Sequence, residues 1–226
     1  MNKVKLEDLG LKDYKETWDY QLGIFNEKIE LKKKGRVNDL HHLLLLEHPH
    51  VYTLGKSADK NNLLVNEAFL SSIGASSYFI ERGGDITYHG PGQLVAYPIF
   101  DIEALGLGVK SYVEAIEKAI IRTIADYGIE GFIVPGKIGV WIKENNEEKK
   151  IAAIGIKCSK YVSMHGLALN VNTNLEMFNH IVPCGIPDKE VCSISSVLGR
   201  EISMPEVKNK LVQHFLDIFD LKLLET

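Results

Sequence analysis

The residue best suited to chemistry in this sequence is a cysteine held in a constrained turn. Cys184 lies between Pro183 and Gly185, which together fix a turn that tends to present the side chain between them. A thiol in such a position becomes a useful nucleophile only if a nearby cation or base raises its thiolate fraction. This stretch alone is equally compatible with an inert loop thiol. Cys184 is therefore a candidate nucleophile whose activation must come from elsewhere in the chain.

Two further polar residues stand within apolar stretches. Lys150 begins the apolar run 151–156, and His165 with Gly166 interrupts the apolar run 162–171. Desolvation in a cleft lowers the pKa of a lysine and lets it take part in proton transfer. The alternatives are a surface lysine at the start of a strand and a histidine that serves only the core. Both residues are therefore candidates for a catalytic cleft, and neither is assigned by its own stretch.

The segment 82–93 combines glycines with side chains that can form hydrogen bonds. Gly83-Gly84 permits positive φ values and close approach of another group to the main chain, and residues 90–92 force a second turn. The segment is neither a dinucleotide fingerprint nor a Walker loop, because the required spacings are absent. It predicts a binding loop, with an ordinary loop as the alternative. Its polar side chains are those of Arg82, Thr87, His89 and Gln93.

The overall composition favours a soluble, reduced and cytoplasmic protein. The 226 residues carry a formal net charge of −4, which argues against a nucleic-acid-binding domain. Three irregularly spaced cysteines match neither a disulfide framework nor a zinc site. Cys158, in a strand, and Cys192, in a helix, are expected to be small buried side chains. No apolar run approaches the roughly 20 residues that span a bilayer, and residues 1–11 are too polar for a signal peptide.

The elements that must position these residues follow from apolar periodicity. Three amphipathic helices are predicted, beginning near the capping-box matches at Asp13, Ser111 and Ser203, and a short helix is predicted after Asn66. Strands are predicted over 40–47, 51–54, 76–81, 93–100, 138–143, 150–157 and 162–171, with Asn145-Asn146 as a hairpin turn. The basic run Lys32–Arg36 is expected to be a solvated helix end, with a docking patch for an acidic partner as the alternative.

The sequence blocks that carry these candidates resemble one family. The run from Arg82 to Pro98 reads RGGDITYHGPGQLVAYP, which is similar to the signature of the lipoyl(octanoyl) transferases. Four more blocks resemble that family in the same order along the chain, between about residues 40 and 200. These blocks are 45–55, 150–155, 165–172 and 183–185. Five blocks in register are far more specific than any one of them.

The resemblance implies a role for each candidate residue. Cys184 would accept an octanoyl group from the phosphopantetheine arm of acyl carrier protein, and Lys150 would lower the pKa of the thiol and help to deprotonate the attacking amine. The substrate-binding residues implied are Arg82, Gly83, Gly84, Asp85, Ile86, Thr87, Tyr88, His89, Ala153, Ile154, Gly155, His165, Gly166, Leu167 and Ala168. The role of His89 stays open between a pocket wall and a proton relay. Whether Lys149 or Lys150 faces the thiol is also open, although the strand register favours Lys150.

The resemblance also implies a fold, partners and a reaction. The fold expected is α/β of the α+β type, one domain over residues 1–226 with a central mixed β-sheet flanked by helices, as in biotin and lipoate protein ligases. The donor would be octanoyl-acyl carrier protein. The acceptors would be lipoyl domains of 2-oxoacid dehydrogenase complexes and the glycine cleavage H protein. A monomer without cofactor, metal, nucleic acid or membrane is expected. The alternatives are an ATP-dependent ligase of the same fold and a non-enzymatic binding domain.

Overall fold

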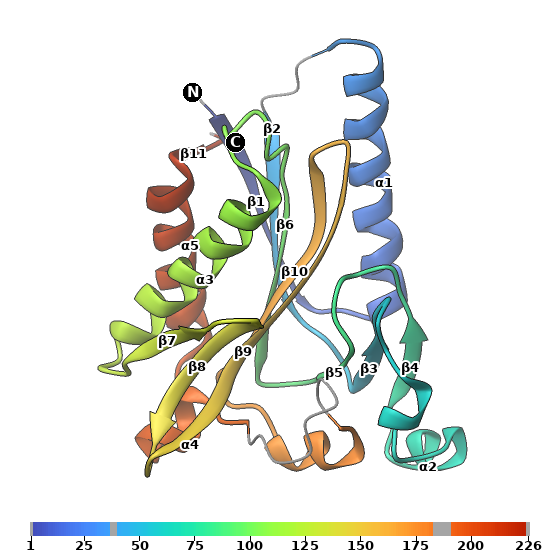
Figure 1. The fold of residues 1–226 in the computed structure, drawn as a ribbon, viewed down its shortest axis with the longest axis vertical. Helices are drawn as coiled ribbons and strands as arrows, with labels where there is room; N and C mark the ends of the chain where they lie inside the picture. Colours follow the sequence, from blue (N-terminus) through green and yellow to red (C-terminus); the bar gives the residue numbers. More distant parts are fainter. Residues whose placement is uncertain (1, 37–39, 183–190, 225–226) are drawn as a thin grey trace.

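The computed structural model describes residues 2–36, 40–182 and 191–224, which form two β-sheets flanked by helices (Figure 1). Among these residues the larger sheet has eight strands in the order β11-β1-β2-β6-β10-β9-β8-β7. They are β1 (Asn2–Leu11), β2 (Leu40–Glu47), β6 (Gln93–Ile99), β7 (Gly131–Val134), β8 (Lys137–Glu144), β9 (Glu147–Ser159), β10 (Val162–Asn170) and β11 (Leu221–Leu223). β1 is parallel to β11 and β2, and the pairs from β2 to β7 are antiparallel. The predicted mixed sheet is confirmed.

The smaller sheet carries the glycine-rich segment. It consists of β3 (Val51–Leu54) between β4 (Ser76–Phe79) and β5 (Ile86–His89). β3 is parallel to β4 and antiparallel to β5. Because only residues 48–50 separate β2 from β3, the chain passes directly from the larger sheet into the smaller one, which lies beside it in Figure 1.

Helices cover both faces of the larger sheet. α1 (Tyr14–Lys33) lies on one face, and α3 (Val109–Ala125) and α5 (Met204–Phe219) lie on the other (Figure 1). In β2, Leu43 and Leu45 pack into the core beneath α3 and α5, whereas Leu44 and Leu46 pack beneath α1. Alternate strand residues face opposite sides of a sheet, so four consecutive leucines are what a strand covered on both faces requires. The shorter helices are α2 (Glu67–Ser72), α4 (Ile194–Leu198), η1 (Lys60–Asn62) and η2 (Leu175–His180).

Most elements form where the sequence predicts them. β2 and β3 have the predicted bounds, and Asn145 and Asn146 have the positive φ values of a tight hairpin turn. Asp13 caps α1 by accepting hydrogen bonds from two backbone amides, and Asn66 caps α2. The predicted cap at Ser111 is wrong, since α3 begins at Val109 after Gly108 and has no side-chain cap. Cys192 is buried as expected but precedes α4 instead of lying within a helix.

The buried face of α1 is more polar than the sequence pattern suggests. Thr17, Gln21 and Lys28 are almost fully buried along this face, whereas the predicted apolar residues Trp18 and Leu22 are only half-buried. Gln21 Oε1 accepts a hydrogen bond of 3.0 Å from the backbone amide of His165, and Lys28 donates one to the carbonyl of Leu40. The helix is therefore held on the sheet by hydrogen bonds as well as by apolar contacts.

The basic run at the end of α1 is engaged within the chain itself. Lys32 Nζ lies 2.7 Å from a carboxylate oxygen of Asp101 and 2.8 Å from one of Glu103, and Lys33 pairs with Glu30 at 2.7 Å. These contacts weaken the interpretation of the run as a docking patch. Among the described residues, no helix is long and apolar enough to cross a membrane.

The buried ammonium of Lys28 should make stability depend on pH. Burial lowers its pKa from 10.5 to about 8. Between pH 8 and 10 the unfolded chain then holds a proton that the folded protein has released, so the free energy of unfolding should rise by about 1.4 kcal/mol per pH unit from this group. Urea unfolding at pH 7.5, 8.5 and 9.5 should show a smaller rise for Lys28→Met than for the unmodified chain. The exposed Lys34→Met is the control, and equal slopes for all three proteins would contradict the assignment.

Candidate active site

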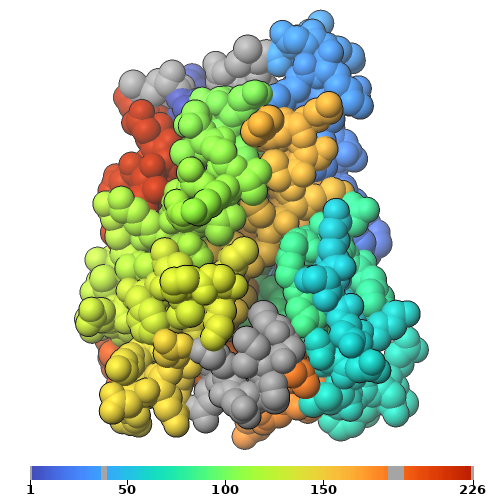
Figure 2. Space-filling view, viewed as in Figure 1, coloured from blue at the N-terminus to red at the C-terminus, as the bar shows by residue number. Residues whose placement is uncertain are grey.

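A cavity of about 590 Å³ lies where β9 loses its neighbour β8. The last residue pair that joins the two strands is Val140 with Ala152, yet β9 continues to Ser159. The glycine-rich segment meets this free edge, since the Gly83 amide donates a hydrogen bond of 2.9 Å to the Ile156 carbonyl. In the lower half of Figure 2, the hairpin of β8 and β9 (yellow) lies on the left and the smaller sheet (cyan to green) lies on the right. The cavity is lined from both of these sides.

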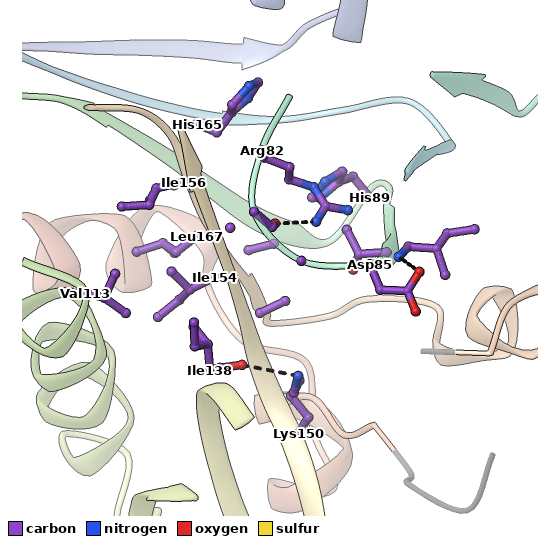
Figure 3. A pocket seen from close by; sticks show the side chains of 18 of the residues that line it. Arg82, Asp85, His89, Val113, Ile138, Lys150, Ile154, Ile156, His165 and Leu167 are labelled. Carbon is purple, nitrogen blue, oxygen red and sulfur yellow. Dashed lines mark hydrogen bonds between the residues drawn. The ribbon is translucent and has the colours of Figure 1, made fainter. Parts of the chain in front are cut away.

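The cavity brings together most residues that the resemblance implicates. It is lined by Arg82, Gly83, Gly84, Asp85, Ile86, Thr87, His89, Lys150, Ala153, Ile154, Gly155, His165, Gly166, Leu167 and Ala168. In Figure 3, Arg82, Asp85 and His89 lie on one side of β9, and the apolar side chains of Ile154, Ile156 and Leu167 lie on the other. Cys184 lies outside the described residues. The roles of all these residues in binding and catalysis stay predictions.

Tyr88 does not belong to the cavity lining. Side chains alternate along β5, so Thr87 and His89 reach the cavity while Tyr88 points into the core of the smaller sheet. There its hydroxyl lies 2.8 Å from His50 Nδ1 and its ring packs against Tyr52. The family block implicates the whole run from Arg82 to His89, but Tyr88 does not line the cavity, whereas Ile86, on the same side of β5, still does.

Lys150 is placed by a β-bulge between β8 and β9. Trp141 pairs with Lys150 while Val140 pairs with Ala152, so Ile151 is the extra residue of a bulge, which re-aims neighbouring side chains. The Lys150 ammonium donates a hydrogen bond of 3.3 Å to the Ile138 carbonyl and lies 4.7 Å from the centre of the Trp141 ring. Figure 3 shows this ammonium at the end of the cavity remote from His165.

The neighbouring Lys149 points elsewhere. Its ammonium pairs with a Glu144 carboxylate oxygen at 3.0 Å, and it does not line the cavity. Of the two lysines between which the sequence left the choice open, Lys150 is the one that lines the cavity, and which of them faces the thiol stays a prediction.

Both histidines of the cavity are buried and neutral near pH 7. Burial lowers the pKa of His89 to about 3 and that of His165 to about 3, and the Arg82 guanidinium adds to the second shift. His89 Nδ1 lies 2.8 Å from Gln93 Oε1, which can only accept, so this nitrogen carries the proton. An imidazole with so low a pKa is a poor proton relay, and His89 therefore fits a wall or positioning role better.

Arg82 holds the glycine-rich segment against the smaller sheet. Its guanidinium donates to the Thr53 carbonyl at 2.6 Å, to Thr53 Oγ1 at 3.0 Å and to the Gly83 carbonyl at 3.0 Å. Because Thr53 Oγ1 accepts from Arg82, its own proton is available to His89 Nε2, 3.5 Å away. The side chain predicted to bind substrate thus also shapes the loop that encloses the cavity.

Several lining residues were not singled out from the sequence. Val113, Ile138 and Ile156 read there as ordinary core residues of a helix and two strands, and nothing in their spacing sets them apart. Asn170 carried a signal, since it stands within a block that resembles the family, and Gln93 had been named among the polar side chains of the glycine-rich segment. Asn170 could therefore have been found from the sequence, whereas the apolar wall could not.

The chain is similar to known proteins over most of its length. The family model described as lipoyl protein ligase A/B catalytic domain matches residues 13–216. A curated octanoyltransferase from Christiangramia forsetii is 47% identical to this chain, and the match covers 99% of each sequence. A curated octanoyltransferase from Flavobacterium johnsoniae is 46% identical, and the match covers 98% of each sequence. A chain from a solved structure of an archaeal lipoylation system, the bi-partite lipoate protein ligase of Thermoplasma acidophilum and its E2 lipoyl domain, superposes on this chain with a TM-score of 0.73 at 18% sequence identity. The superposition covers 100% of this chain and 87% of that one.

The fold and the family model together define a class of catalytic domain. The chain belongs to the lipoyl protein ligase A/B catalytic-domain family. Within that family its curated relatives are octanoyltransferases over nearly their whole length, and the chain is an acyltransferase of this kind. The family that the sequence blocks indicated is thereby confirmed, as is the expected fold.

Alanine substitution is expected to have opposite effects on stability at Gly155, where the glycine-rich segment approaches β9, and at Gly23 in α1. A Cβ on Gly155 would lie 2.9 Å from the Gly83 carbonyl oxygen, so Gly155→Ala should push the loop away and cost about 1–3 kcal/mol of stability. Gly23, within α1, has nothing within 4 Å of a built Cβ, so Gly23→Ala should stabilise by up to about 1 kcal/mol. Urea unfolding of the two variants checks this, and an unchanged stability for Gly155→Ala would contradict the packing argument.

Proposed function

We propose that this chain transfers an octanoyl group from octanoyl-acyl carrier protein to the target lysine of lipoyl domains, through a thioester on Cys184. This is the first step of endogenous protein lipoylation, a part of lipoate biosynthesis. The observation that carries the proposal is one cavity where Lys150 meets a glycine-rich loop and an apolar wall, in a chain nearly half identical to curated octanoyltransferases over their full length. The whole chain is taken as one catalytic domain. Free Cys158 and Cys192 suit the reducing cytoplasm.

The reaction requires two exchanges at one thiol. In the first, the Cys184 thiolate attacks the carbonyl carbon of the carrier thioester, a new carbon–sulfur bond forms, and the carrier leaves as a thiol that takes up a proton. In the second, the neutral amine of the acceptor lysine attacks the acyl-enzyme, an amide forms, and the amine proton returns to Cys184. Two thioesters are closely matched in energy, and the amide draws the sequence forward, so the chemistry needs no nucleotide.

Lys150 is the residue proposed to assist both steps. An ammonium about 4 Å from a thiolate stabilises it by up to about 4 kcal/mol before desolvation, whereas one unit of thiol pKa corresponds to about 1.4 kcal/mol. Its ammonium borders the cavity, on the Trp141 ring and beside the Ile138 carbonyl. From this place the ammonium stabilises the thiolate and gives its proton to the departing carrier thiolate. As a neutral amine it then accepts the proton of the attacking lysine and passes it to the sulfur of Cys184.

The cavity wall suits a saturated acyl chain. Ile154, Ile156 and Leu167 supply apolar surface, and Ala153 and Gly155 leave room beside them. Each buried methylene contributes about 0.8 kcal/mol, so a cavity that ends after eight carbons distinguishes chain lengths. Proposed acceptors are lipoyl domains of 2-oxoacid dehydrogenase complexes and the glycine cleavage H protein, which would reach the acyl group by inserting a lysine.

Intact-protein mass spectrometry tests the covalent step directly. Octanoyl-acyl carrier protein mixed with the chain, without ATP, should add about 126 Da, localised to Cys184 and discharged by an apo lipoyl domain. Cys184→Ala should take up no acyl group, whereas Cys158→Ala, at a half-buried cysteine of β9, should still do so. No adduct, together with modification only when free octanoate and ATP are supplied, would replace the transferase with a ligase.

The two adjacent lysines provide a matched test of the catalytic assignment. Lys150→Ala should lower kcat for octanoyl transfer about 10²- to 10⁴-fold, the range for loss of a positioned acid–base group. Lys149→Ala removes an ion pair with Glu144 away from the cavity and should stay within about twofold of the unmodified chain. Steady-state rates for both variants decide the matter, and equal losses would remove Lys150 from its proposed role.

A further inference from the structure

A chain of buried hydrogen bonds leads from the glycine-rich segment to the backbone of Lys150. His89 Nδ1 donates to Gln93 Oε1 at 2.8 Å, and Gln93 Nε2 donates to Asn170 Oδ1 at 2.9 Å. Asn170 Nδ2 then donates to the Cys192 carbonyl at 2.9 Å. The Cys192 amide in turn donates to the Lys150 carbonyl at 3.0 Å. These hydrogen bonds therefore connect β5, β6 and β10 with β9, the strand that carries Lys150.

The side-chain amides of Gln93 and Asn170 each have one permitted orientation. Gln93 Nε2 faces two acceptors, the Tyr88 carbonyl and Asn170 Oδ1, so its Oε1 must face His89. Asn170 Oδ1 consequently accepts from Gln93, which turns Nδ2 toward the Cys192 carbonyl. Carboxamides exchange protons poorly, so the chain fixes positions instead of conducting protons.

The participants are too deeply buried for water to replace a lost partner easily. Gln93 is 1% exposed, Asn170 4% and Cys192 2%. Removing one side chain from such a chain leaves its neighbours unsatisfied, which costs more than the bond itself contributes. Both backbone polar groups of Cys192 are therefore held: its carbonyl accepts from Asn170, and its amide donates to Lys150.

We propose that Asn170 is a positioning residue that sets the place of the Lys150 ammonium through the Cys192 peptide. Lys150 is held on one side by the bulge opposite Trp141 and on the other by the bridge to Val191 and the Cys192 amide. Loss of the Asn170 amide frees the second side and displaces the lysine backbone. The inference rests on the proposed function, in which Lys150 acts on the thiol of Cys184.

Alkylation of Cys184 measures this effect without any substrate. The rate of iodoacetamide modification, followed by peptide mass spectrometry between pH 5.5 and 10, reports the pKa of the thiol. Asn170→Ala should raise that pKa toward the value found in Lys150→Ala and slow alkylation at pH 7 by about three- to tenfold. The double variant should show no further rise. Cys192 should stay unmodified, since burial raises the pKa of its thiol to about 12.

Asn172 offers a matched control in the same segment. Its side chain also makes two hydrogen bonds, to the Ile202 carbonyl at 2.7 Å and from the Ile202 amide at 3.0 Å, and neither of them belongs to the series that leads to Lys150. Asn172→Ala should lower thermal stability and leave the pKa of Cys184 unchanged. Asn170→Asp, which preserves volume but cannot donate to the Cys192 carbonyl at neutral pH, repeats the test if the alanine variant does not fold.

The outcomes separate this inference from the proposed function. If the unmodified chain forms the octanoyl thioester while both Asn170 variants keep its Cys184 pKa, the positioning role is overturned. A rise of similar size in Asn172→Ala would also overturn it, because the effect would then follow general destabilisation. If the unmodified chain forms no thioester at all, the proposed function fails first, and the displaced lysine has no thiol on which to act.

Discussion

The two sheets meet through the hydrogen bond that the Gly83 amide donates to the Ile156 carbonyl. Beyond Ala152, β8 no longer lies beside β9, and the carbonyls on that edge need other donors. The glycine-rich segment supplies one, and it comes close enough because Gly155 has no side chain. This contact holds the start of the glycine-rich segment against β9, while β5 is held by its pairing with β3, and residues of both line the cavity. An interrupted strand ladder thereby leaves the cavity to which the proposed chemistry is assigned.

The polar groups beside the cavity divide into two kinds. Near one end, buried histidines stay neutral, and Tyr97 fixes a further one by donating to His48 Nε2 at 2.8 Å, where burial lowers the pKa of the ring to about 4. At the other end lies the ammonium of Lys150, on an aromatic ring and against a backbone carbonyl. The buried histidines are thus neutral wall groups near pH 7, and the proposed proton transfer is assigned to Lys150.

Local sequence signals predicted local structure well. The leucine run of β2, the Asp13 cap and the Asn145-Asn146 turn each depend on a few neighbouring residues. The polar strand β1 was not predicted, because its pairing with β2 and β11 is set by distant parts of the chain. The same reason explains the polar buried face of α1, whose Gln21 accepts from the distant His165 amide. The cavity residues were found through family blocks, since no spacing along the chain indicates that β8 stops short of β9.

The pairing of β11 with β1 has a consequence for association between molecules. Among the residues that the structure describes, β11 pairs only with Asn2 to Val4, so the remainder of β1 lies at the edge of the larger sheet, where unpaired backbone groups can recruit strands from other chains. This stretch carries Lys5, Glu7 and Asp8, and Asp8 pairs with Lys208 of α5 at 2.8 Å. Charged side chains of this kind discourage a second copy from adding its own strand. The charged residues that prevent prediction of β1 from an apolar pattern are thus the same residues that oppose aggregation at this sheet edge.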